Sequence, residues 1–74
     1  MPHVRVTGRR AIFESAQAVE ALRDHLGVGR SEAQSLADAI AAGHPPRLEV
    51  ATLGTAHALA VALRQAGADT EVVE

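Results

Sequence analysis

Residues 27–36 decide how the middle of this 74-residue chain folds, and they read Gly-Val-Gly-Arg-Ser-Glu-Ala-Gln-Ser-Leu. Two glycines within three positions break a helix, because glycine is unfavourable in a helix interior and readily adopts the left-handed backbone that ends one. Ser31 followed by Gln34 has the spacing of a capping box, which starts a helix. The stretch therefore predicts a tight turn between two consecutive helices.

The segments on both sides of this turn have helical periodicity. Over residues 11–26, the apolar positions cover an arc of roughly 220°, wider than the stripe of about 100° that one contact needs. We therefore expect the first helix, which includes Ile12, to pack against two neighbours. The second helix is predicted over residues 31–42, because Gly43 and the pair Pro45-Pro46 forbid its continuation.

Three short strands complete the pattern. Residues 3–7 and 47–51 alternate polar and apolar side chains, and residues 70–73 form a closing strand. A third helix is predicted over residues 56–66, with turn and N-cap chemistry in residues 52–55. The order β-α-α-β-α-β predicts a single α+β domain over residues 1–74, with a three-stranded, mostly antiparallel sheet that carries three helices on one face. The predicted core residues are Val4, Val6, Leu22, Leu36, Ile40, Leu48, Val50, Leu59, Leu63 and Val72.

The composition limits the classes of function. The net charge is −2, with seven arginines and no lysine, which argues against a nucleic-acid partner because such a partner requires a basic face. The chain has no cysteine, which excludes disulfides and thiolate zinc sites and fits a cytoplasmic protein. No apolar run is long enough for a membrane span. Sixteen alanines without a lysine are typical of a high-GC bacterial gene.

The residues that could carry chemistry do not form a catalytic or metal-binding motif. The four histidines fall on different predicted elements without metal-ligand spacing, so we expect them to be solvated. Asp24-His25 and the serines lack a nucleophile elbow, and the glycines of residues 27–29 follow a helix, whereas a dinucleotide fingerprint follows a strand. We therefore expect neither enzyme activity nor a metal or cofactor. Arg9-Arg10 beside Arg5 is either an anion-attracting cluster or a solvated loop.

Several stretches resemble one known family, the C-terminal domain of the bacterial ribosomal stalk protein (the seven/twelve protein of the large subunit). Residues 27–36 resemble its Gly-Leu-Gly-Leu-Lys-Glu-Ala-Lys-Asp-Leu segment, and residues 66–72 resemble its terminal Ala-Gly-Ala-Glu-Val-Glu-Val. The remaining similarity lies in Ala56-His57-Ala58-Leu59 and Leu63 of the last helix. The resemblance covers about residues 15–73 and implies the α+β fold that the stalk domain shares with the ClpS adaptor.

The function implied by the resemblance is a non-catalytic protein-protein interaction module. In the stalk family, the first helix and the following turn recruit translation factors through lysines, one arginine and small apolar residues. Here only Arg23 keeps its charge, while Glu20 and Gln34 replace lysines, so the lysine face is largely lost. The predicted binding surface for a protein or peptide partner comprises Ala16, Val19, Glu20, Arg23, Val28, Gly29 and Arg30.

Two alternatives remain open at the level of sequence. Packing against the second helix is the alternative role for Ala16 and Val19. A ClpS-like adaptor that binds peptide N-termini for a protease is the alternative function, but Gly8-Arg9-Arg10 stands where that family carries acidic residues, and arginines repel a positive amine.

The outer side of the third helix suggests a further contact surface. Its outward positions include Ala58, Val61 and Ala62, whereas an isolated domain usually places charges there. Alanine bias from a GC-rich gene is one explanation, because alanine is the best helix former. The other explanation is a weak homodimer formed through His57, Val61 and Arg64.

Overall fold

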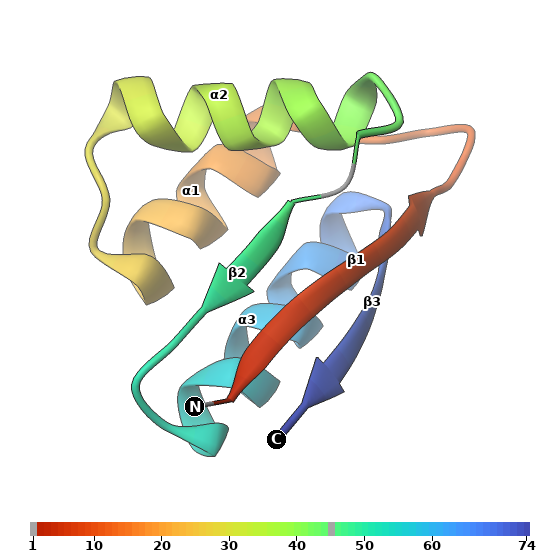
Figure 1. Ribbon diagram of the computed structural model, residues 1–74. Helices are drawn as coiled ribbons and strands as arrows, with labels where there is room; N and C mark the ends of the chain where they lie inside the picture. The colour runs from red at the N-terminus through yellow and green to blue at the C-terminus, as the bar shows by residue number, and fades with distance from the viewer. Residues whose placement is uncertain (1, 45) are drawn as a thin grey trace.

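The computed structural model describes residues 2–44 and 46–74, so Pro45 of the predicted helix stop lies outside the described residues. The elements are β1 (His3–Arg9), α1 (Ser15–Leu26), α2 (Arg30–Ala41), β2 (Arg47–Glu49), α3 (Leu53–Ala66) and β3 (Ala68–Val73). The strand β1 lies between β2 and β3 and is antiparallel to both (Figure 1). The predicted α+β architecture and its element order are confirmed.

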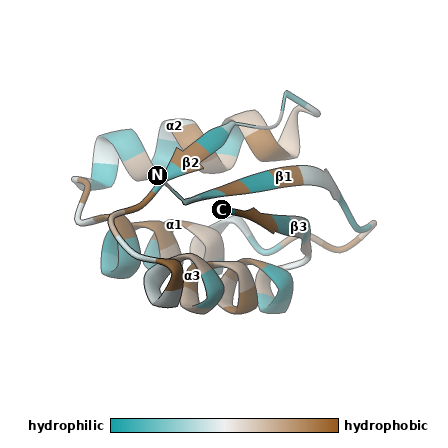
Figure 2. Ribbon diagram, turned by 60° about the horizontal axis from the view of Figure 1, so that its bottom comes forward, coloured by the Kyte–Doolittle hydropathy of each residue, from teal (hydrophilic) through white to brown (hydrophobic). Residues whose placement is uncertain are grey.

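The sheet is apolar on one face and polar on the other, as the alternation in the sequence predicts. Val4, Val6 and Leu48 are buried on the helix side. The exposed residues on the other face are Arg5 and Thr7 of β1 and Arg47 and Glu49 of β2. Hydrophobic and hydrophilic residues alternate along β1 (Figure 2). The helix α3 packs against β1 and β3, and α2 packs against β1. Among residues 2–44 and 46–74, no helix or strand covers the opposite face of the sheet.

The wide apolar arc of α1 is explained by its place between two helices. The helix packs against both α2 and α3. Its buried residues Ala18, Val19, Ala21 and Leu22 therefore divide between two contacts. The expectation that this helix has two neighbours is confirmed.

Small side chains make up a large part of the core. Eight of the seventeen buried hydrophobic residues are alanines, which allow the helices to approach closely. Eight of the ten predicted core residues are buried. Leu36 and Val72 are only partly buried and pack against the rim of the core, so their prediction as buried residues is wrong.

The first helix begins at Ser15, not at Ala11 as predicted. Residues 10–14 instead pass the C-terminal end of α3, where the Arg10 and Glu14 amides donate to the carbonyl oxygens of Gly67 and Ala66 at 2.8 and 2.7 Å. These bonds satisfy carbonyl groups that a helix end leaves without partners. Ile12, placed on the helix by its spacing, lies in this loop and is 77% exposed.

The predicted capping box at Ser31 is also wrong. The helix α2 begins at Arg30 with Gly29 as its N-cap, and its first turn has no side-chain cap among the described residues. The Gln34 side chain donates to Asp38 Oδ1 at 2.9 Å, one turn further along the helix. Gln34 therefore takes part in a side-chain pair within α2 in place of a cap.

A β-bulge in β1 changes the role of Arg9. The register of β1 with β3 shifts between Val6 and Gly8, which makes Thr7 the extra residue. After the shift, Arg9 pairs with the buried Ala68, and its Nε donates to the carbonyl oxygen of Ala41 at 2.8 Å. A positive charge is favourable at the C-terminal end of a helix because of the helix dipole. The last turn of α2 contains no basic residue, and Arg9 of β1 places its guanidinium group there instead.

The remaining boundaries differ from prediction by a few residues. The strand β2 ends at Glu49, although Val50 stays buried and its amide donates to the Pro2 carbonyl oxygen at 3.2 Å. The helix α3 begins at Leu53, because the Thr52 hydroxyl accepts from the Thr55 amide at 3.1 Å and caps the helix earlier than predicted. The closing strand begins at Ala68, because pairing with β1 continues past the bulge.

Leu63→Ala is expected to lower the free energy of unfolding by about 2 to 5 kcal/mol, because Leu63 is fully buried and its truncation leaves a cavity. Chemical denaturation monitored by circular dichroism measures the change. The control is Leu53→Ala in the same helix, where the side chain is only partly buried and the loss should be smaller. Equal losses in the two variants would contradict the assigned core.

Gly67→Ala is expected to destabilise the domain far more than Gly27→Ala. Both glycines have positive φ values, 105° and 70°, so both substitutions carry backbone strain. A Cβ atom at Gly67 would also overlap the Ile12 carbonyl oxygen, whereas a Cβ atom at Gly27 meets nothing within 4 Å. Similar melting temperatures for the two variants would show that residues 10–14 do not pass this close to α3.

Candidate functional site

The exposed ridge of α1 carries part of the predicted protein-binding surface. Ala16, Glu20 and Arg23 are exposed and follow one another at spacings of four and three residues, which places them along one side of the helix. Val19 is only 6% exposed and belongs to the core. For Val19, packing inside the domain is therefore the correct alternative. On this ridge, Ala16 is small and apolar, whereas Glu20 and Arg23 are charged.

The turn between α1 and α2 holds the rest of that predicted surface. Gly27 ends α1 in the left-handed conformation, and its amide donates to the Arg23 carbonyl oxygen at 3.1 Å. Val28 is half-buried and packs against the core. Gly29 and Arg30 are exposed at the start of α2. The turn therefore presents backbone and one guanidinium group to a partner.

The charges on this α1 surface are mixed in sign. Glu20 and Arg23 lie on the ridge, and Arg30 lies at the turn. Within residues 2–44 and 46–74, none of these three takes part in an ion pair or a side-chain hydrogen bond. The surface is thus an exposed polar one, with a positive end at the turn and one acidic group along the ridge.

The outer side of α3 differs from the α1 ridge, because it presents an aliphatic side chain. Val61 is 50% exposed, and it and Ile12 are the two large hydrophobic side chains that the described part of the chain exposes. His57 and Ala58 are also exposed, one turn before Val61. Arg64 donates from Nη2 to the Thr70 carbonyl oxygen at 3.1 Å, which holds its side chain towards β3. The three residues predicted for self-association thus lie on one helix, with Val61 at the centre.

The remaining titratable residues stay dispersed. His3 lies on β1, His25 at the end of α1, His44 after α2 and His57 on α3. Within the described ranges, no three histidine or carboxylate side chains gather as a metal ion would require. Across the same residues, no helix combines the length and apolar character needed to cross a bilayer.

The structure separates the arginines that are close in sequence. Arg9 caps the C-terminal end of α2, and the Nε atom of Arg10 lies 3.7 Å from the Asp69 carboxylate. Arg5 lies on the uncovered face of the sheet, where it faces Arg47 of β2. The strand alternation places both residues on the polar face, but the register that makes them neighbours is a long-range property that the local pattern does not contain.

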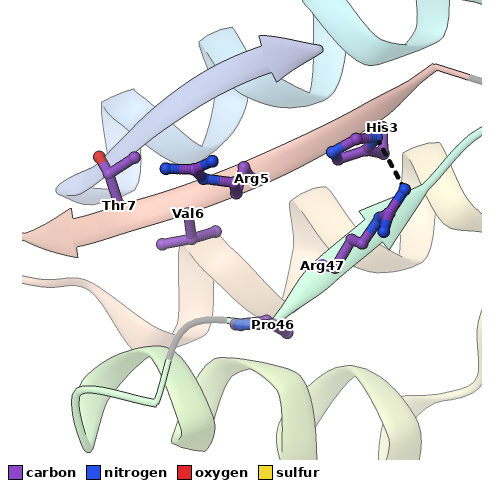
Figure 3. A pocket seen from close by; sticks show the side chains of 6 residues that line it. All are labelled: His3, Arg5, Val6, Thr7, Pro46 and Arg47. Carbon is purple, nitrogen blue, oxygen red and sulfur yellow. Dashed lines mark hydrogen bonds between the residues drawn. The ribbon is translucent and has the colours of Figure 1, made fainter. Parts of the chain in front are cut away.

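A depression of about 520 Å³ lies at this junction of β1 and β2, lined by His3, Arg5, Val6, Thr7, Pro46 and Arg47 (Figure 3). The local sequence pattern does not predict this depression. Its one signal in the sequence is the pair of arginines at polar positions of two strands.

Comparison with known proteins adds no family assignment: no protein-family model matches the chain, and no curated protein matches it.

Proposed function

We propose that this domain is a non-catalytic protein-protein interaction module with the architecture of the ribosomal stalk C-terminal domain. The observation that carries the proposal is Val61, which is half-exposed in the middle of a helix with little charge on its outer side. Exposed aliphatic side chains that are surrounded by small residues fit a protein contact, because neighbouring helices can approach closely. The simplest occupant of this surface is a second copy of the chain, with α3 packed against α3 about a two-fold axis near Val61.

The charge of α3 fits a contact with limited affinity. His57 and Arg64 are its ionisable residues, and Arg64 is held towards β3. No carboxylate on α3 is available to pair with them across the two-fold axis. Self-association through this helix therefore depends on apolar burial alone, and we expect it to be weak.

The α1 ridge and the adjoining turn form a second candidate surface for a different protein partner. With Val19 inside the core, this surface depends on charge and hydrogen bonding. The family that the sequence resembles uses lysines here to attract acidic translation factors, and Glu20 has the opposite sign. A partner of the α1 ridge is therefore expected to differ in charge from the acidic factors of the stalk protein.

Val61→Glu is expected to weaken self-association at least about tenfold, because a carboxylate at the two-fold axis would lie close to its own mate in an apolar contact. Sedimentation equilibrium at near-millimolar protein measures the effect. The matched control is Gln17→Glu, which adds the same charge at an exposed position of α1. A wild-type protein that stays strictly monomeric would contradict the proposed dimer. Equal effects of Val61→Glu and Gln17→Glu would also contradict it.

Glu20→Lys combined with Gln34→Lys is expected to increase binding to an acidic translation-factor domain. Both residues are exposed, so the substitutions should leave the core intact. The increase should be larger at low salt, because the attraction between exposed charges is screened. Calorimetry with an elongation factor at two salt concentrations tests this. Tight, salt-insensitive binding by the wild type would contradict the proposed loss of the lysine face.

A further inference from the structure

The uncovered face of the sheet carries a pair of like charges held opposite each other. In the antiparallel register of β1 and β2, Arg5 lies directly across from Arg47. Residues paired in this way have Cβ atoms about 4.5 to 5.5 Å apart, and like charges at that position are destabilising. The pairing is imposed by the buried neighbours Val4 and Leu48, which are also cross-strand partners. The two strands therefore cannot shift by one residue to separate the arginines without exposing the core.

The two guanidinium groups turn away from each other. In Figure 3, the Arg5 side chain extends along β1 towards Thr7, while Arg47 extends towards His3. Arg47 makes two long contacts, from Nη2 to His3 Nδ1 at 3.5 Å and from Nε to Glu49 Oε1 at 3.9 Å. Arg5 takes part in no ion pair or side-chain hydrogen bond within residues 2–44 and 46–74, although Glu71 is its partner on β3. Both groups therefore keep N–H donors available to a ligand.

The chain leaves space beside this pair. The β1–β2 ladder stops at Arg5 and Arg47, and the next residue of the chain on the β2 side is Pro46, which has no N–H to donate. The strand β1 continues for four residues beyond this point. The depression of about 520 Å³ occupies this junction, and its volume falls within the range of small-molecule sites.

We infer that this depression binds a small phosphate-type anion between Arg5 and Arg47. A planar guanidinium group donates two parallel hydrogen bonds to an oxyanion. Both side chains are exposed and point away from each other, so each would rotate towards an anion between them, and their repulsion would be replaced by two attractive contacts. His3 and the Thr7 hydroxyl line the same depression and can each contribute a polar contact. This site is separate from α3 and α1, so it goes beyond the proposed protein-binding function.

The surrounding carboxylates restrict the ligand to a small anion. Glu49 lies opposite His3, Glu71 lies opposite Arg5, and Asp69, two residues before Glu71 on β3, lies opposite Gly8. These groups repel any extended polyanion that crosses the sheet, in agreement with the net charge of −2. Because the Arg47 side chain is 64% exposed, solvent screens the attraction, and we expect a dissociation constant on the order of 1 mM.

The test is a titration of the ¹⁵N-labelled protein followed by heteronuclear NMR. The ligands are inorganic phosphate and O-phosphoserine, which distinguish a free phosphate from a phosphorylated side chain, and sodium chloride provides matched ionic strength. We expect saturable shifts at the amides of Arg5, Thr7 and Arg47 with one or both phosphate compounds, and no saturation with chloride. Chemical-shift changes that depend only on ionic strength would contradict the proposed anion site.

Substitutions then assign the binding to the arginine pair. Arg5→Gln and Arg47→Gln should each raise the dissociation constant at least about fivefold, and Arg5→Lys should raise it less because the charge remains. Arg30→Gln is the matched control, since it removes an exposed arginine from α2. The same spectra report whether each variant is folded. Equal weakening by Arg30→Gln, or unchanged affinity in both pair variants, would overturn the inference.

Discussion

The close passage of residues 10–14 over the C-terminal end of α3 is the contact on which the rest of the domain depends. Two backbone hydrogen bonds join Arg10 and Glu14 to the last carbonyl groups of α3, and Gly67 is the residue whose missing side chain makes room for Ile12. The contact ends β1, sets the start of α1 and positions Ala68 to pair with Arg9. A single glycine thus allows the close approach at the point where the first strand, the first helix and the last strand meet.

The alanine-rich core determines which surfaces remain for partners. Because α1 lies between α2 and α3, its apolar residues are used inside the domain, and Val19 cannot serve as an exposed anchor. The helix α3 contacts the sheet on one side and α1 on another, and its outer side keeps Val61 exposed. The aliphatic surface lies on α3 for this reason, while α1 presents charges.

Local patterns in the sequence predict the elements and the two neighbours of α1, but not the backbone contacts between distant segments. The alternation of residues 3–7 and the buried positions Leu22, Leu59 and Leu63 follow from periodicity alone, and the structure confirms them. The start of α1 could not be predicted, because the carbonyl groups that hold residues 10–14 belong to a helix more than fifty positions away. Ser31 and Gln34 are a different case, because the competing interactions are local: α2 begins at Arg30 with Gly29 as its N-cap, and Gln34 bonds to Asp38 one turn further along. Spacing shows which bonds are available, and competition from other local partners or from tertiary contacts decides which of them form.

The candidate anion site also depends on a long-range property, namely the register in which β1 pairs with β2. Since α2 and α3 pack on one face of the sheet, the other polar strand residues are exposed on the opposite face, whereas Thr70 and Arg9 bond to helix carbonyl groups. Arginines and carboxylates must therefore share a small area on the opposite face. The bulge at Thr7 moves Arg9 from that face to the helix side, and Asp69 neutralises Arg10. Arg5 and Arg47 remain opposite each other because Val4 and Leu48 fix the register from the buried face. Burial on one side of the sheet thus maintains an unfavourable charge pair on the other, and an anion is the ligand that relieves it.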